Sequence, residues 1–178
     1  DQGSGIDKKS FKQAHKPKQG KQPKQVRDPA IIPNDIARQS FLPGQPFSKR
    51  LEHNTFLKFL ANQFGNDAAE RLADYYLIGT TKKFYGSPIF WQVDEQGRFR
   101  YGNVIGYHAS GHRLKGQAIA FHALSGTGLS NDFKENYKRC LFGAHLIPDS
   151  SGPFGVVESE KTAVIASYYI PSFTWLAT

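Results

Sequence analysis

Glu158 is the residue whose place along the chain points most clearly to chemistry. It directly follows the apolar run "FGVV" and precedes "SEKTAVIASYY", a stretch compatible with a helix. A break at Pro171 and a second apolar run, "FTWLA", complete a strand–helix–strand pattern of about 25 residues, which is typical of a right-handed parallel βαβ unit. In such a unit the Glu158 carboxylate lies at the carboxyl edge of the sheet, where open α/β sheets bind their ligands.

A purely structural role for this acidic segment fits the same pattern. Glu158 or Glu160 would then only complement the positive amino end of the following helix, which stabilises a protein by about 0.3–1 kcal/mol. The residues alone leave both interpretations open.

Other motif-like residues lack the context that their chemistry requires. His108 and His112 have the spacing of helical zinc ligands, but the Ser and Gly between them predict a solvated loop, and no third ligand is indicated. Cys140 stands beside apolar residues and is expected to be a buried small hydrophobe. Neither feature indicates a metal or nucleophile site.

Two or three helices are expected before any strand. Asn34 is a candidate N-cap for a short helix that ends before Pro43. Asn54 is expected to cap a second helix, which Gly65 ends, and Asn66 a third. The residues expected to share one face of the third helix are Ala69, Leu72, Tyr75 and Tyr76.

The middle of the chain changes to the two-residue period of strands. Residues 88–93 and 99–107 are rich in β-forming side chains and are separated by "DEQGR", in which Gly97 supplies a turn. We therefore expect an antiparallel hairpin. A polar loop, "HASGHRLKG", follows, and a short helix is expected near residues 132–138.

The 178 residues divide by composition into a basic tail and a globular part. Residues 1–27 hold eight of the 23 Lys and Arg residues but only two of the 15 Asp and Glu residues, and almost no large apolar side chains. Because burial cannot offset the entropy of ordering such a segment, we predict a disordered basic linker over residues 1–29. It is either a solvated spacer or a non-specific phosphate-binding arm.

Composition also narrows the class of protein. One cysteine cannot form an internal disulfide or a multi-cysteine zinc site, and no charged-then-apolar leader opens the chain, so a cytoplasmic location is expected. No apolar stretch approaches the ~20 residues that cross a bilayer, and no membrane partner is expected. Because the chain lacks Met and begins at Asp1, we expect it to be a piece of a longer protein.

The segment "VVESEKTAVIAS" resembles the first motif of Toprim domains, the nucleotidyl-transfer and strand-cleavage fold of primases, topoisomerases and some nucleases. Upstream, "IFWQVDEQGRFRYGNVIGY" is similar to a hairpin of bacterial primases, and "KRCLFGAHLI" resembles the segment before their Toprim strand. Together with "FLKFLANQFG", these blocks stand in the order found in a primase-like family of Bacteroidota and their mobile elements. This resemblance spans roughly residues 30–178.

The resemblance implies an α+β fold class. A helical and hairpin subdomain over residues 30–150 would be followed, over residues 151–178, by the first βαβ unit of a Toprim-type α/β sheet, with the basic tail in front. The catalytic Glu and Mg²⁺ ligand of the family falls on Glu158, and Lys161 occupies a further position of the motif. An Asp-x-Asp pair would complete the site after Thr178, and a zinc ribbon is expected before the chain begins.

The implied activity is metal-dependent nucleotidyl transfer, such as primer synthesis, in replication or mobile-element maintenance. Its partners would be single-stranded DNA template, nucleotides, and a helicase or other replication protein. A non-enzymatic single-strand-binding or partner-docking module and a Toprim-type nuclease are the alternatives.

Tyr101 and Tyr107 of the expected hairpin either stack bases or pack in the core. The candidate nucleic-acid contacts are Lys82, Lys83, Arg98, Arg100, Arg113, Lys115 and Lys161.

Overall fold

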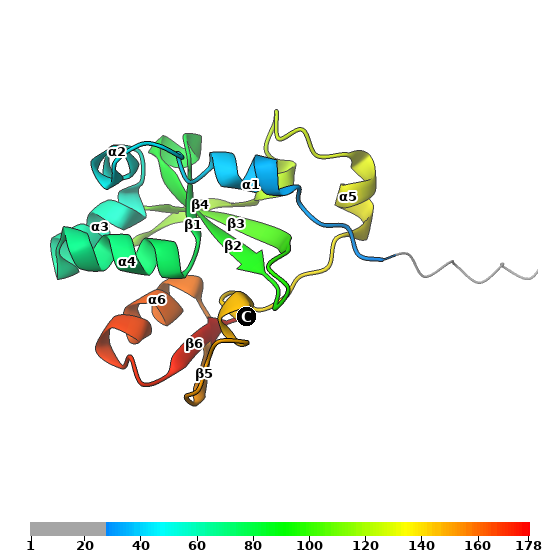
Figure 1. The fold of residues 1–178 in the computed structure, drawn as a ribbon. Helices are drawn as coiled ribbons and strands as arrows, with labels where there is room; N and C mark the ends of the chain where they lie inside the picture. Colours follow the sequence, from blue (N-terminus) through cyan, green and yellow to red (C-terminus); the bar gives the residue numbers. More distant parts are fainter. Residues whose placement is uncertain (1–27) are drawn as a thin grey trace, which may run out of the picture.

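A four-stranded antiparallel sheet lies at the centre of the computed structural model, which describes residues 28–178 (Figure 1). The strands follow one another in the order β1–β2–β3–β4, and helices lie on both faces. The linker predicted over residues 1–29 falls almost wholly outside the described residues. The architecture within them is the mixed α+β class that the sequence predicts.

The predicted hairpin forms the middle of this sheet and is confirmed. β2 (Ser87–Val93) pairs with β3 (Phe99–Tyr107) in antiparallel register. The turn contains Gly97 at φ 75°, a left-handed conformation that glycine adopts without steric cost. Every residue of β2 is buried, because both faces of this strand are covered.

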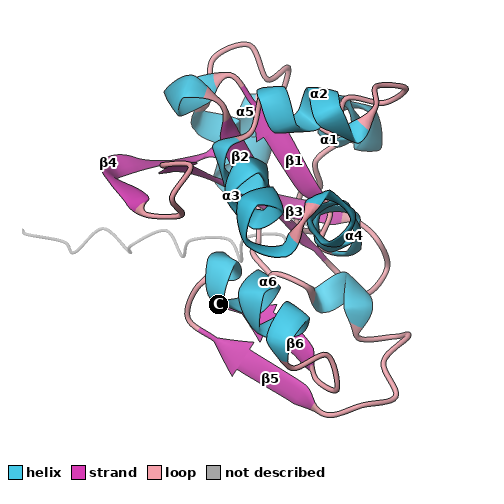
Figure 2. Cartoon of the chain, turned by 90° about the vertical axis from the view of Figure 1, so that its left-hand side faces the viewer, coloured by secondary structure: helices cyan, strands magenta, loops and turns pink. Residues whose placement is uncertain are grey.

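The two outer strands are not predicted by the sequence. β1 (Ile78–Thr81) is only four residues long, and β4 (Arg113–Ala120) begins inside the segment expected to be a polar loop. All residues of β4 are exposed or half-buried, and Figure 2 shows this strand at the edge of the sheet. An edge strand tolerates charged and glycine residues, which hide the period of a buried strand.

Asn54 caps α3 (Thr55–Phe64) as predicted, and its side-chain oxygen accepts hydrogen bonds from the backbone N–H groups of Phe56 and Leu57. The caps predicted at Asn34 and Asn66 are wrong, because each is the first helical residue and no side chain caps either helix.

No helix of residues 28–178 is long and apolar enough to cross a membrane. The helices are α1 (Asn34–Gln39), α2 (Phe47–Glu52), α3 (Thr55–Phe64), α4 (Asn66–Tyr75) and α5 (Asn131–Asn136).

Each face of the sheet has its own apolar cluster. One lies under α3 and α4 and includes Phe56, Tyr76 and Phe90. The other lies toward α1 and α5 and includes Trp91 and Phe133. The face predicted for the third helix is correct for Ala69, Leu72 and Tyr76, whereas Tyr75 is 46% exposed.

A second sheet, of two strands, is formed by the last part of the described chain. β5 (Phe154–Val157), α6 (Glu160–Tyr169) and β6 (Thr174–Ala177) follow one another, and the two strands pair in parallel. This is the strand–helix–strand order that the sequence pattern predicts. Figures 1 and 2 both show the unit beneath α4 and the antiparallel sheet.

The parallel unit packs into the cluster under α3 and α4. Ala163 and Val164 of α6 are fully buried there. The Tyr76 hydroxyl donates a hydrogen bond of 3.0 Å to the Trp175 carbonyl, and Phe142 exchanges two backbone hydrogen bonds with β6. Residues 151–178 therefore share a core with the preceding part, and the domain boundary after residue 150 stays a prediction.

A substitution at Asn54 measures how much the contact between α3 and β1 stabilises the fold. The buried Asn54 side chain also donates hydrogen bonds to the Gly79 carbonyl (3.1 Å) and the Thr80 hydroxyl (3.0 Å) of β1. We predict that Asn54→Ala lowers the free energy of unfolding by about 2 kcal/mol, because it removes a cap and leaves buried polar groups unpaired. Urea denaturation followed by circular dichroism measures this loss.

Asn66→Ala is the matched control. Asn66 is exposed and caps nothing, so its replacement should change the free energy of unfolding by less than about 0.5 kcal/mol. Equal losses in the two variants would contradict the role given to Asn54.

Candidate functional site

A pocket of about 320 Å³ lies where the parallel unit meets the antiparallel sheet. One wall is formed by the carboxyl ends of β5 and β6 and the amino end of α6, and the other by β3 and β4. This is the edge at which the sequence places Glu158. The polar residues on its lining include Asn103, Arg113, Glu158, Glu160, Thr162 and Thr178.

The side chain of Glu158 is exposed at the pocket. It directly follows β5, and only its backbone carbonyl is engaged, by the Thr178 hydroxyl at 3.5 Å. No side chain in the described part of the chain forms an ion pair or hydrogen bond with the Glu158 carboxylate. Among residues 28–178 the carboxylate, which lines the pocket, therefore has no competing side-chain partner.

Glu160, two residues later, has the opposite environment. It is 5% exposed, and its Oε1 accepts a hydrogen bond of 2.6 Å from the Asn103 side-chain amide on β3. Ser159 caps α6 by accepting a hydrogen bond from the Thr162 backbone N–H. The structural role proposed for this acidic segment thus suits Glu160, at the positive end of the helix.

Lys161 is held in place by the antiparallel sheet. Its ammonium donates a hydrogen bond of 2.7 Å to the Gly111 carbonyl in the β3–β4 turn. It also lies 5.5 Å from the centroid of the Phe59 ring and 5.9 Å from that of Tyr107. Lys161 therefore ties α6 to the sheet, and its predicted nucleic-acid contact stays a prediction.

The two hairpin tyrosines pack in the interior, as the second of the two alternatives expects. Tyr107 is 4% exposed, and burial raises its pKa to about 12, with a further contribution from the Glu160 charge. Tyr101 is 8% exposed and lies under the Arg139 guanidinium, 4.6 Å from the ring centroid. Neither ring is accessible for stacking on a base, because both side chains are buried.

The described residues do not make a complete magnesium site. Within residues 28–178 no group of three or more His, Cys, Asp or Glu side chains is arranged to hold a metal. Mg²⁺ prefers octahedral oxygen ligation and commonly binds one or two carboxylates together with water. Glu158 suits one such ligand, whereas Glu160 is already engaged by Asn103.

The remaining candidates for chemistry have simple explanations. His108 and His112 are exposed and form a turn through their backbones, as the loop prediction states. Burial raises the pKa of the Cys140 thiol to about 11, so this thiol is protonated and unreactive at neutral pH.

Comparison with known proteins places the chain in a family. The family model named "Domain of unknown function (DUF6371)" matches residues 54–178. The chain belongs to the DUF6371 family. The match begins at the cap of α3 and includes the whole pocket. No curated protein and no solved structure matches the chain.

The basic residues predicted to contact nucleic acid do not form one surface in this DUF6371 domain. Of the seven, Arg113 alone lines the Glu158 pocket. Lys115 is exposed further along β4, and Lys82 and Lys83 are exposed after β1, beside a different pocket. The candidates are therefore spread over several elements.

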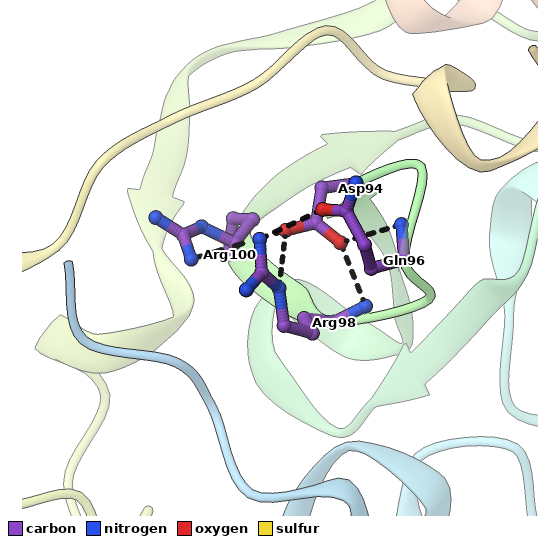
Figure 3. Close-up of polar contacts among 4 residues, drawn as sticks. All are labelled: Asp94, Gln96, Arg98 and Arg100. Atoms are coloured by element: carbon purple, nitrogen blue, oxygen red, sulfur yellow. Dashed lines mark hydrogen bonds and ion pairs between the residues drawn. The ribbon is translucent and has the colours of Figure 1, made fainter. Parts of the chain in front are cut away.

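Arg98 and Arg100 are engaged by a buried carboxylate in the hairpin turn of the DUF6371 domain (Figure 3). The Arg98 Nε lies 2.8 Å from Asp94 Oδ2, and the Arg100 guanidinium lies 3.9 Å from the same oxygen. The backbone N–H groups of Gln96 and Arg98 donate to the other oxygen. Both arginines thus have a structural partner, and the geometry disfavours their predicted phosphate contacts.

Asn103 lines the pocket but is not among the predicted site residues. It is a polar residue inside the otherwise apolar strand "YGNVIGY", and such a residue indicates a buried polar partner. The partner, Glu160, is 57 residues away in the chain. No local pattern predicts a pair at this separation.

The Asp94 turn gives a pH-dependent prediction. Burial alone would raise the Asp94 pKa, but the Arg98 backbone N–H, the Arg98 guanidinium and the Gln96 N–H lower it below its usual value. A carboxylate with a lowered pKa in the folded state stabilises the protein above its unfolded pKa of about 3.9, and this stabilisation is lost as the pH falls through the folded value. Wild type should therefore lose stability in acid more steeply than Asp94→Asn.

Urea denaturation at a series of pH values measures both curves. The difference in unfolding free energy between wild type and Asp94→Asn should be constant above about pH 5 and shrink below it. Glu70→Gln, at an exposed carboxylate beyond the first turn of α4, serves as the control and should follow wild type. A difference between wild type and Asp94→Asn that is independent of pH would contradict the charged role of Asp94.

Proposed function

We propose that this domain belongs to a primase-like Toprim protein that acts on nucleic acid, with Glu158 as its catalytic carboxylate and a Mg²⁺ ligand. The observation that carries the proposal is the free Glu158 carboxylate, which follows a parallel strand directly and opens into a pocket. The carboxyl edge of parallel strands is where α/β folds bind their ligands. The Toprim resemblance of "VVESEKTAVIAS" supports the same residue.

The pocket offers charge of both signs, as a phosphate accompanied by a cation requires. Arg113 and the amino end of α6 favour an anionic group, and Glu158 favours a cation. Bound Mg²⁺ would neutralise charge that develops on a transferred phosphoryl group. Since Glu158 supplies one ligand, the proposal requires further carboxylates, which the resemblance assigns to an Asp-x-Asp pair after Thr178.

The outer face of β5 supports a larger α/β sheet of the Toprim type. Phe154 is 47% exposed and Val156 is 58% exposed, although parallel strands in folded proteins are normally covered on both faces. Further strands and helices beside β5 would bury both side chains. We therefore propose that β5, α6 and β6 are the first unit of such a sheet.

The proposed setting is DNA replication or mobile-element maintenance in the cytoplasm. The proposed partners are a single-stranded DNA template and nucleotides, together with a helicase or another replication protein. The second candidate is a non-enzymatic single-strand-binding or docking module. This module needs no metal site, and no three-ligand group is present within residues 28–178. A Toprim-type nuclease would use the same Glu158 for cleavage.

Glu158→Gln tests the proposal in the full-length protein. The substitution keeps the shape of an exposed side chain, so the free energy of unfolding should change by less than about 0.5 kcal/mol. Mg²⁺-dependent primer synthesis or strand cleavage should fall by a factor of about 100 or more, because a charged group that acts on the transition state is lost. Both are measured on a single-stranded DNA template with labelled nucleotides.

Glu70→Gln, at an exposed carboxylate of α4, is the control and should keep full activity. Wild-type activity in Glu158→Gln would exclude Glu158 as the catalytic carboxylate. Wild-type protein that binds single-stranded DNA but neither extends nor cleaves it would favour the docking module instead.

A further inference from the structure

The loop between β1 and β2 has an unusual backbone. Phe84 and Tyr85 lie in the left-handed region at φ 50° and φ 62°, and Gly86 follows at φ 97°. A non-glycine residue in this region is strained by about 1 kcal/mol or more, and such strain gathers at functional sites. Two consecutive aromatic residues are thus held in a conformation that neither prefers.

The loop is fixed at its base and presents one ring to solvent. The Gly86 carbonyl accepts hydrogen bonds from both the backbone N–H (2.9 Å) and the hydroxyl (3.0 Å) of Thr55, at the start of α3. Phe84 packs against the apolar cluster around Trp91. Tyr85, in contrast, is 92% exposed, far more than any other large apolar side chain of residues 28–178.

Positive charge flanks the exposed ring. Lys82 and Lys83 are exposed, and within the described residues neither forms an ion pair. The Lys83 ammonium lies 5.3 Å from the centroid of the Phe84 ring. They line a hollow of about 550 Å³ whose other side is formed by Ile119, Leu124 and Ser125. Tyr85 does not line this hollow, but it follows Lys82 and Lys83 by three and two residues in the same short loop. An exposed ring and two exposed ammonium groups in one loop are complementary to a ligand that carries both flat rings and repeated negative charge.

We propose that residues 82–85 form a docking surface for single-stranded nucleic acid, in which a base stacks on Tyr85 and phosphates bind Lys82 and Lys83. Stacking on aromatic rings together with lysine–phosphate contacts is how single strands are bound without sequence preference. An acidic peptide would satisfy the two lysines but would leave the ring without a stacking partner. The inference rests on the proposed nucleic-acid function and adds to it a binding surface separate from the Glu158 pocket.

Fluorescence anisotropy with labelled oligo(dT) tests the docking surface on the whole chain. Tyr85→Ala should weaken binding by about 5- to 150-fold, which is the range of base–aromatic stacking. Tyr85→Phe keeps the ring and should bind within about twofold of wild type. Tyr169→Ala, at another exposed tyrosine on α6, is the matched control and should also bind as wild type does.

The contribution of Lys82 and Lys83 is measured separately, by how the binding constant depends on salt concentration. Replacing Lys82 and Lys83 together by Gln should reduce the slope of log K against log salt by about 1.4, since each single-strand phosphate contact contributes about 0.7. Oligo(dT) should compete with the labelled strand far better than a poly-Glu peptide of equal charge.

Three results would overturn the inference: no binding by wild type, equal binding by Tyr85→Ala, or equal competition by the peptide. Tyr85→Ala leaves the Glu158 pocket intact, so the two proposals can fail separately. Normal binding by Tyr85→Ala together with an inactive Glu158→Gln variant would remove only the docking surface. Weakened binding by Tyr85→Ala in a protein whose Glu158→Gln variant stays active would remove only the catalytic assignment.

Discussion

The hydrogen bond from the Asn103 amide to the Glu160 carboxylate joins the two sheets at the edge of the pocket. A buried carboxylate is costly unless it is paired, so the amino end of α6 must stay against β3 to satisfy Glu160. Packing of Ala163 and Val164 in the shared core fixes the rest of the helix. The position of Glu158 follows from this contact, because Glu158 lies between β5 and the helix that Glu160 begins.

Two carboxylates only two residues apart thus have different roles. Glu160 points inward and stabilises the junction, whereas Glu158 is exposed at the strand end and has no internal partner among the described residues. Of these two carboxylates, Glu158 is therefore the one that is accessible to solvent. Lys161 donates a second hydrogen bond between α6 and the antiparallel sheet, to the Gly111 carbonyl in the β3–β4 turn.

The elements with strong local signals could be predicted from the sequence. The hairpin, the Asn54 cap and the parallel unit follow from alternation, capping chemistry and apolar runs. β4 could not be predicted, because an edge strand carries no buried period. Contacts between residues far apart in the chain could not be predicted either. The hydrogen bond between Asn103 and Glu160 forms only when the sheet has folded. The exposure of Tyr85 depends on a left-handed backbone conformation at Phe84 and Tyr85, which the residue types in "KKFYG" do not predict.

A double-mutant cycle on Asn103 and Glu160 tests the central contact most directly. Urea denaturation of Asn103→Ala, Glu160→Ala and the double variant should give a coupling energy of about 1.5–3 kcal/mol, the range of hydrogen bonds to charged groups. Asn103→Ala combined with Glu158→Ala, the exposed carboxylate, should be additive. Additivity of the Asn103 and Glu160 substitutions within about 0.5 kcal/mol would show that the contact does not join the two sheets.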